Sequence, residues 1–346
     1  MERSQKLRFG VIGIDHRHVY DQVRGLLDIG AECAGYWTEF PVATERGFTE
    51  RFPAIARVAT RQQLLDDESV QLLICAAIPK LRAGYAVEAM RHGKDFMADK
   101  PGVTTFEQLQ MVKEAQADTG AIFSVNFTER FEVRAVTKAT ALVRAGAIGT
   151  VLQTVGLGPH RLNAATRPAW FFDALSYGGI LADIGSHQID QFLHFTGAQD
   201  AEILFSRYGN LAHPQYPGLH DFGEMVLASG AASAYVRVDW FTPDGLASWG
   251  DGRLTILGTD GYIELRKYVD IAGRPAKDHL FLVNHEGTRY IDCSGEALPY
   301  YSDLRRDIFE RTETAMTQAH CFKVCELALR AQAVARRIDP QEASHG

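Results

Sequence analysis

Apolar residues along the first third of the chain alternate between short continuous runs and longer stretches with helical spacing. Short buried strands separated by helices are typical of a mostly parallel sheet with helices on both faces. Glycines close two of the predicted helices, at Gly93 and Gly120. The predicted strands cover residues 7–12, 32–37, 72–76, 95–97 and 122–125, and the predicted helices cover residues 19–29, 81–92 and 106–118.

The pattern changes after residue 126. A predicted helix is followed by six strand candidates, which a single helical segment interrupts, and the chain closes on a long helical pattern. Several strands with few helices are typical of an open, largely antiparallel sheet in a separate α+β domain. We therefore predict an α/β chain with two domains, 1–126 and 127–346. The later helices are predicted at 133–144 and 314–337, and the strands at 151–157, 201–207, 223–227, 232–240, 253–257 and 262–267.

Composition narrows the class of protein. A chain of 346 residues is long enough for two cores. Its net charge of −7 and the lack of a basic run disfavour a nucleic-acid partner. No apolar stretch is long enough to span a bilayer, so no membrane partner is expected. Five scattered cysteines favour a reducing, cytoplasmic compartment. Cys321 and Cys325 lie beside His320 without a second ligand pair, so no metal is predicted.

The turn after the first predicted strand has the form of a dinucleotide-binding loop. Such a loop needs glycines so that the backbone approaches a pyrophosphate at a helix N-terminus. Gly13 fits the first glycine, whereas Asp15 and His18 occupy the second and third positions. A plain strand–turn–helix is the alternative. The candidate loop consists of Gly13, Ile14, Asp15, His16, Arg17 and His18.

Two polar residues, Thr38 and Glu39, follow the second predicted strand. An acidic residue about 20 positions past the glycine turn binds the ribose hydroxyls of a dinucleotide. Glu39 would repel a 2′-phosphate, which slightly favours NAD over NADP. Thr38 is equally able to accommodate a phosphate, and a solvated glutamate at a strand end is the alternative.

A lysine precedes a proline at the carboxyl end of another predicted strand, at Lys100 and Pro101. The proline favours an extended conformation for the lysine. In open α/β sheets this edge faces the ligand crevice. A lysine there donates to a substrate oxygen and stabilises charge that develops on it. A surface lysine in a turn is the alternative.

A helical pattern over residues 178–190 places Asp183, His187 and Asp190 on one stripe, because residues three and four apart are neighbours on a helix. Histidine, with a pKa of about 6.5, suits acid–base chemistry near neutrality. Asp183 would orient the imidazole or bind a substrate hydroxyl, and Asp190 is predicted to be structural. An ordinary helix with a buried histidine is the alternative.

Taken in order, these motifs resemble the Gfo/Idh/MocA family, the glucose-fructose oxidoreductase, inositol dehydrogenase and rhizopine-catabolism group. Asp99-Lys100-Pro101 looks like the family's Glu-Lys-Pro motif, residues 178–190 look like its Asp-x-Gly-x-His-x-x-Asp motif, and residues 10–13 look like its Gly-x-Ile-Gly start. Asn126, with an Arg-Phe pair at 130–131, stands where the family often has an Asn before such a pair.

The resemblance implies a Rossmann domain, a second domain with an open sheet, and hydride transfer between NAD, or NADP, and a secondary alcohol. Lys100, Asp183 and His187 would be the catalytic set, with Lys100 touching both the substrate hydroxyl and the nicotinamide ribose. The resemblance also implies dimers or tetramers formed through the open sheet. Further cofactor contacts would come from Ala76, Ala77, Pro79 and Asp99.

Substrate contacts are expected from the second domain. Asn126, His160 and Arg161 are candidates, because arginine binds planar anions in a bidentate manner. Trp170 would stack on a sugar-like face. The predicted substrate is a sugar, a cyclitol or a sugar acid. An NAD-assisted glycosidase or lyase and a non-catalytic dinucleotide or sugar sensor are the alternatives.

Overall fold

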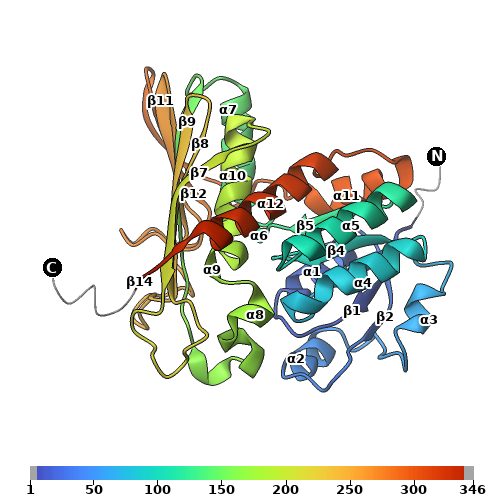
Figure 1. Cartoon of the computed structure of the whole chain (residues 1–346). Helices are drawn as coiled ribbons and strands as arrows, with labels where there is room; N and C mark the ends of the chain where they lie inside the picture. Colours follow the sequence, from blue (N-terminus) through green and yellow to red (C-terminus); the bar gives the residue numbers. More distant parts are fainter. Residues whose placement is uncertain (1–5, 339–346) are drawn as a thin grey trace. The chain divides into compact units, whose positions relative to one another are not determined.

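The computed structural model describes residues 6–338, which form two compact units (Figure 1). Unit 1 consists of the chain up to Asn126, together with Leu175–Gly178 and Pro299–Cys325. Unit 2 consists of Phe127–Ala174, Gly179–Leu298 and the chain from Glu326 onward. The change of unit at Asn126 falls where the hydrophobic pattern changes. The roles assigned to the two parts stay predictions.

Unit 1 contains a five-stranded parallel sheet in the order β2-β1-β3-β4-β5, which confirms the predicted α/β class. The strand order reverses between β1 and β3, and ligands bind at the carboxyl ends of the strands at such a point. The strands are β1 (Arg8–Ile12), β2 (Glu32–Trp37), β3 (Leu72–Cys75), β4 (Asp95–Asp99) and β5 (Phe123–Asn126). The helices are α1 (Val19–Asp28), α2 (Thr44–Arg51), α3 (Gln62–Leu65), α4 (Pro79–Arg91) and α5 (Phe106–Thr119).

The C-terminal part of unit 1 packs against the edge strand β5. It comprises α11 (Tyr300–Glu310) and the first part of α12 (Gln318–Val334). Tyr300 Oη lies 2.7 Å from Ser124 Oγ, and Asn126 Nδ2 donates to Tyr301 Oη at 2.9 Å. Two expectations change here. The helix predicted at 314–337 begins later and ends earlier, and the hydrophobic pattern does not predict α11.

Unit 2 is built on a nine-stranded sheet in the order β13-β12-β11-β10-β6-β9-β8-β7-β14. The pairs β6–β9 and β7–β14 are parallel and the other neighbours are antiparallel, which confirms a largely antiparallel second sheet. The strands are β6 (Val151–Pro159), β7 (Glu202–Gly209), β8 (Phe222–Ser229), β9 (Ala232–Asp239), β10 (Arg253–Gly258), β11 (Gly261–Arg266), β12 (His279–Asn284), β13 (Gly287–Asp292) and β14 (Arg336–Ile338).

Helices of unit 2 pack against this sheet (Figure 1). Glycines on β6 permit a close approach, since a Cβ added at Gly156 would lie 2.4 Å from Gln188 Oε1 on α10. Apolar residues of α7 and α10, such as Ala139 and Phe195, join strand residues such as Ile256 in one buried core. The helices are α6 (Thr128–Phe131), α7 (Arg134–Arg144), α8 (Ala174–Tyr177), α9 (Ile180–Asp183) and α10 (Gly185–Thr196), with 3₁₀ turns at Ala164–Thr166 and Ala169–Phe172; α8 ends in unit 1.

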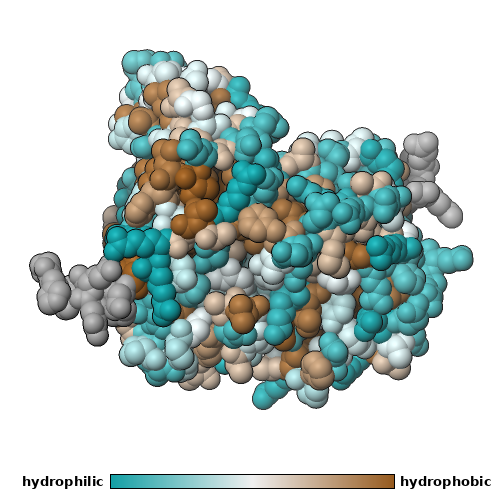
Figure 2. All heavy atoms as spheres, viewed as in Figure 1, coloured by the Kyte–Doolittle hydropathy of each residue, from teal (hydrophilic) through white to brown (hydrophobic). Residues whose placement is uncertain are grey.

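The surface shown in Figure 2 is mixed, and hydrophobic side chains gather over part of the strands of unit 2. Large apolar side chains that are exposed on these strands include Leu204, Phe205, Leu257, Tyr262 and Tyr290. Within residues 6–338, every helix is too short or too polar to cross a membrane.

Candidate functional site

The loop after β1 is shaped by a single glycine. Gly13 has φ +79°, and a Cβ added there would lie 2.4 Å from Ala77 Cβ. Its N–H donates to the Trp37 carbonyl at 2.8 Å, and the Ala76 N–H donates to the Gly13 carbonyl at 3.1 Å. His18, by contrast, has φ −58°, which any residue adopts. The loop therefore forms without the second and third glycines, and the cradle at Gly13 fits a dinucleotide.

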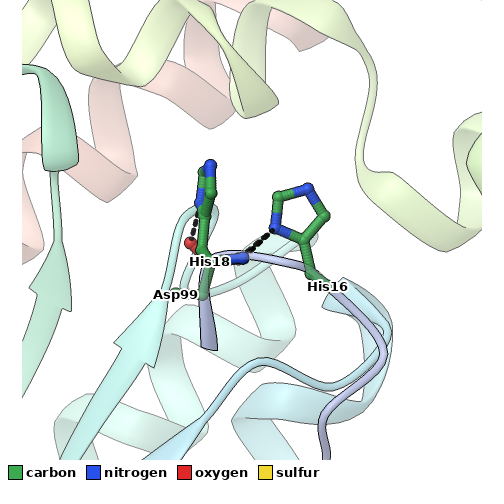
Figure 3. Close-up of side chains that lie close together, drawn as sticks. All are labelled: His16, His18 and Asp99. Carbon is green, nitrogen blue, oxygen red and sulfur yellow. Dashed lines mark hydrogen bonds and ion pairs between the residues drawn. The ribbon is translucent and has the colours of Figure 1, made fainter. Parts of the chain in front are cut away.

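Asp99, the last residue of β4, is the centre of a polar cluster at this edge of the sheet (Figure 3). Its Oδ1 accepts from His18 Nδ1 and from the backbone N–H of Lys100, both at 2.8 Å. Its Oδ2 lies 3.0 Å from an Arg82 terminal nitrogen and 3.1 Å from His16 Nδ1. Four nitrogen atoms thus surround one fully buried carboxylate.

Electrostatics fix the protonation states of Asp99 and His16 near neutrality. Burial alone would raise the pKa of Asp99, but His18, Arg82 and His16 outweigh burial and hold the pKa well below 3.8. Burial, aided by His18 and opposed by Asp99, lowers the pKa of His16 from 6.5 to about 3. Asp99 is therefore ionised and His16 is neutral at physiological pH.

His16, His18 and Asp99 each offer a ligand atom within 4.8 Å of the other two, as a metal site would require. Arg82 occupies one oxygen of the same carboxylate, and the Lys100 N–H donates to the other. The guanidinium already balances the Asp99 charge, so a divalent cation would add uncompensated positive charge. We assign no metal to this cluster.

Arg82, which the sequence pattern did not single out, positions the turn that carries Lys100. Its side chain is 1% exposed. It donates to the carbonyls of Ala77 at 2.8 Å, Asp99 at 2.8 Å and Lys100 at 2.6 Å. An arginine on a helix looks like a surface residue in sequence, and only the fold reveals that it is buried. Lys100 itself is buried, and its bond to Pro101 is cis.

The other predicted cofactor residues lie at the ends of the same strands. Thr38 is buried and donates to the Phe40 carbonyl at 3.1 Å, whereas the exposed Glu39 accepts from Tyr85 Oη at 3.0 Å. Arg17 is exposed. Ile14, Ala76, Ala77 and Pro79 are buried beside the loop, Asp15 is half-buried with its pKa raised by burial, and Asn126 is buried at the end of β5.

In unit 2 the predicted acid–base residues lie on two consecutive helices rather than on one. The helical pattern is interrupted at Ile184, so that Asp183 ends α9 and His187 belongs to α10. His187 is buried, with its ring centroid 6.3 Å from that of Phe127, and Asp183 is half-buried. Asp190 accepts two hydrogen bonds from Arg130, at 2.7 and 2.8 Å. This pair ties α10 to α6.

A buried ionic network, also missed in the sequence, lies beside His187. Lys267 Nζ and Gln188 Nε2 donate to Glu129 Oε2, at 2.5 and 2.8 Å. Burial opposes ionisation of Glu129, but the charges of Lys267, His187 and His160 prevail and lower its pKa to about 2. Glu129 Oε1 is buried and has no hydrogen-bond partner among residues 6–338.

Aromatic rings extend this network. The His160 ring lies 4.6 Å from Trp249 and 5.2 Å from Trp240, and Trp249 lies 4.4 Å from Tyr268. The Glu129 charge also raises the pKa of Tyr268, after burial, which is the larger cause. Carboxylate, imidazole and aromatic groups therefore occur together in unit 2.

Two other residues predicted to bind substrate, Arg161 and Trp170, follow His160 in the sequence. Arg161 donates to the carbonyls of Pro243 at 2.8 Å and Leu246 at 2.6 Å, so part of its guanidinium holds a loop. Trp170 is half-buried, with its ring 6.1 Å from that of Phe171.

Family models match both parts of the chain. A model of the oxidoreductase family with an NAD-binding Rossmann fold matches residues 8–127, and a model of the GFO/IDH/MocA C-terminal domain matches residues 136–264. The chain belongs to the GFO/IDH/MocA family. Unit 1 therefore contains an NAD-binding Rossmann fold, and the cofactor is a nicotinamide dinucleotide.

GFO/IDH/MocA relatives include two Bacillus subtilis (strain 168) enzymes. The scyllo-inositol 2-dehydrogenase (NADP(+)) is 25% identical over 150 residues, which are 43% of this chain and 41% of that enzyme. The scyllo-inositol 2-dehydrogenase (NAD(+)) is 23% identical over 273 residues, which are 77% of this chain and 69% of that enzyme. The chain thus matches less than half the length of the first enzyme.

A solved structure has the same fold along nearly the whole chain. A candidate oxidoreductase of Erwinia carotovora atroseptica SCRI1043 is 46% identical, and the match covers 96% of this chain and 100% of that one, with a TM-score of 0.93. Its name gives no substrate.

Proposed function

We propose that this protein is an NAD(P)-dependent dehydrogenase that oxidises a secondary hydroxyl of a neutral sugar or cyclitol. The carrying observation is that carboxylate, imidazole and aromatic groups occur together in unit 2 of an NAD-binding oxidoreductase, and that Gln188, next to His187 on α10, donates to Glu129. Carboxylates accept hydrogen bonds from hydroxyl groups, and aromatic rings offer an apolar face to the ring carbons. Both scyllo-inositol dehydrogenases among the relatives are named for a neutral cyclitol.

The three catalytic roles follow from chemistry. A bound nicotinamide would supply a hydride acceptor. Lys100, whose turn Arg82 holds, donates a hydrogen bond to the substrate oxygen and stabilises developing negative charge. His187 takes the hydroxyl proton as general base. Asp183 accepts a hydrogen bond from a second substrate hydroxyl.

The charge of Glu129 favours a neutral substrate over a sugar acid. This carboxylate is buried and ionised, and the charges of Lys267, His187 and His160 lower its pKa. Lys267 balances the charge at Oε2, but a substrate carboxylate near Oε1, which has no hydrogen-bond partner among residues 6–338, would meet a like charge where water screens little. A hydroxyl would instead donate to Oε1. The proposed substrate is therefore a neutral sugar or cyclitol and not a sugar acid.

The cofactor preference is proposed to be NAD. Glu39 is exposed at the end of β2, and a carboxylate at this position repels a 2′-phosphate. The test is the ratio of kcat/KM for NAD+ and NADP+. Glu39→Gln is expected to lower this ratio by about tenfold.

We also propose that the protein forms homodimers or homotetramers through the sheet of unit 2. Large exposed apolar side chains on its strands, such as Phe205, Leu257 and Tyr262, support this proposal. Light scattering after size-exclusion chromatography measures the mass of the particle. A monomer at all concentrations would contradict it.

The activity itself is tested by a screen of polyols, cyclitols, sugars and sugar acids with NAD+ and NADP+. Absorbance of the reduced nicotinamide reports hydride transfer. Net reduction with a neutral polyhydroxylated compound is expected. Consumption of a substrate without reduced cofactor, or the absence of turnover despite cofactor binding, would contradict the proposal.

A further inference from the structure

The hydrogen-bond pattern around Asp99 determines which nitrogen of His18 carries a proton. The Asp99 carboxylate is ionised and only accepts hydrogen bonds. At 2.8 Å from Oδ1, His18 Nδ1 must therefore be the donor (Figure 3). The neutral ring then has a bare lone pair at Nε2, and further protonation adds an N–H at that atom.

His18 stands where the cofactor loop meets α1. It is the N-cap residue of that ten-residue helix, and 29% of its side chain is exposed. In dinucleotide-binding folds the pyrophosphate lies at this helix end, next to backbone that glycine normally keeps bare. The His18 ring stands at the N-terminus of α1 and contacts Asp99 at the carboxyl end of β4, so it lies at the edge of the sheet where the diphosphate is expected.

The charged groups around His18 favour the binding of an anion beside its ring. Asp99 is the negative group in contact with it, and Arg82 already pairs with the same carboxylate at 3.0 Å. His16, whose ring lies 4.2 Å away, is neutral at physiological pH. Lys100 follows Asp99 on the same turn and adds positive charge, and Asp15 is the other acidic residue of the loop, half-buried with its pKa raised by burial.

We propose that His18 binds the cofactor diphosphate as an imidazolium, with Asp99 holding its Nδ1–H and Nε2–H donating to a phosphate oxygen, so that cofactor binding takes up a proton. A neutral ring would direct its lone pair at the phosphate, which is repulsive. The inference rests on the nicotinamide cofactor of the proposed function. It assigns to the loop a charged donor in place of the missing glycines.

Calorimetric titration of the full chain with NAD+ tests this inference. In buffers of different ionisation enthalpy, the slope of the observed enthalpy against the buffer value gives the number of protons taken up. Proton uptake that approaches one proton at the upper end of the pH range tested is expected. The Kd is expected to rise by up to about tenfold per pH unit in that range.

Substitutions separate His18 from its neighbour. His18→Asn is expected to abolish proton uptake and to raise the Kd by about tenfold or more at low pH. His18→Arg is expected to restore affinity without proton uptake, because its charge is permanent. The matched control is His16→Asn, which changes another histidine beside the same carboxylate. The pKa of His16 is about 3, so this histidine does not titrate near neutrality. The His16→Asn variant should retain the uptake.

A measurement on the unaltered protein covers the case in which the variants fail to fold. With histidine labelled at Cε1, NMR titration should show one imidazole whose pKa rises when NAD+ binds. Binding without proton uptake, or uptake that persists in folded His18→Asn, overturns this inference and leaves the dehydrogenase proposal intact. A chain that binds neither NAD+ nor NADP+ at any pH overturns both.

Discussion

At the residue scale, two carboxylates organise this protein. Asp99 in unit 1 is surrounded by nitrogens from three segments of the chain, and Glu129 in unit 2 binds a buried lysine and a glutamine. Both have lowered pKa values although they are buried, since neighbouring positive groups outweigh desolvation. Each therefore provides a permanent negative charge next to a histidine.

The catalytic roles predict losses of turnover. Lys100→Ala and His187→Ala should each lower kcat by about 10²-fold or more, because each removes a donor or a base from the transition state. His187→Ala should leave the Kd for the cofactor unchanged, as measured by nicotinamide fluorescence. Lys80→Ala, at an exposed position on α4, is the control and should behave like the wild type. Full turnover in both variants would refute the assignment.

The role of Glu129 predicts a change of specificity. Glu129→Gln keeps a hydrogen-bond acceptor but removes the charge, so the ratio of kcat/KM for a sugar acid and for its neutral polyol should rise by about tenfold. Glu129→Ala should lower the free energy of unfolding by about 3–5 kcal/mol, because Lys267 is left buried without its partner. An unchanged ratio in a folded Glu129→Gln protein would contradict the role.

At the element scale, close approaches between elements determine where the functional groups lie. The loop after β1 lies against the end of β3 because Gly13 has no side chain, and α10 lies close to β6 at Gly156 for the same reason. Larger residues at these points would displace the loop that carries His18 and the helix that carries His187. The glycines thus act on function through packing.

Gly13→Ala should destabilise unit 1 and weaken cofactor binding. The added methyl would lie 2.4 Å from Ala77 Cβ at a positive φ, which costs about 1–3 kcal/mol. The Kd for NAD+ should rise by about tenfold or more. Gly84→Ala is the matched control, because Gly84 is an exposed residue of α4 with open space around it. It should stabilise the protein by about 0.5–1 kcal/mol. Urea unfolding measures both changes, and equal effects would contradict the packing explanation.

At the scale of the whole molecule, a half-buried histidine in each unit, His16 in unit 1 and His220 in unit 2, links stability to pH. Burial is the main cause that lowers the pKa of His16 to about 3 and that of His220 to about 4, against 6.5 in the unfolded chain. Both are neutral in the native state, so the unfolded state binds protons first as the pH falls. Their contribution to the free energy of unfolding is complete above pH 6.5. It is lost progressively as the pH falls toward 4 for His220 and toward 3 for His16.

The free energy of unfolding should therefore fall by up to about 1.4 kcal/mol per pH unit for each histidine below pH 6.5. His16→Asn and His220→Asn should each flatten this dependence relative to the wild type. Carboxyls such as Asp278, whose pKa is raised by burial, act in the opposite direction and stabilise the native state as the pH falls. They are present in both the variant and the wild type, so the comparison cancels their effect. Chemical unfolding at several pH values is the measurement, and identical slopes would contradict the prediction.

The sequence by itself determined the class of fold and the strands of the first sheet, whereas α11 and the strands β12, β13 and β14 were not predicted. Alternating apolar runs predicted the parallel sheet, and the change of pattern after Asn126 predicted the second, largely antiparallel sheet. These features depend on local spacing and on short turns, which neighbouring residues encode. The Gly13 turn, the Lys-Pro pair and His187 were recognisable for the same reason, although the break at Ile184 was not.

Only the tertiary structure decided how the candidate residues are held. Asp99 and His18 are 81 positions apart in the sequence, and Lys267 and Glu129 are 138 apart, so no local spacing predicts either contact. Arg82 looked like a surface helix residue, yet it is buried against the turn of Lys100. Burial and charge pairing depend on which segments the fold brings together, and these determine the protonation states on which the proposed chemistry depends.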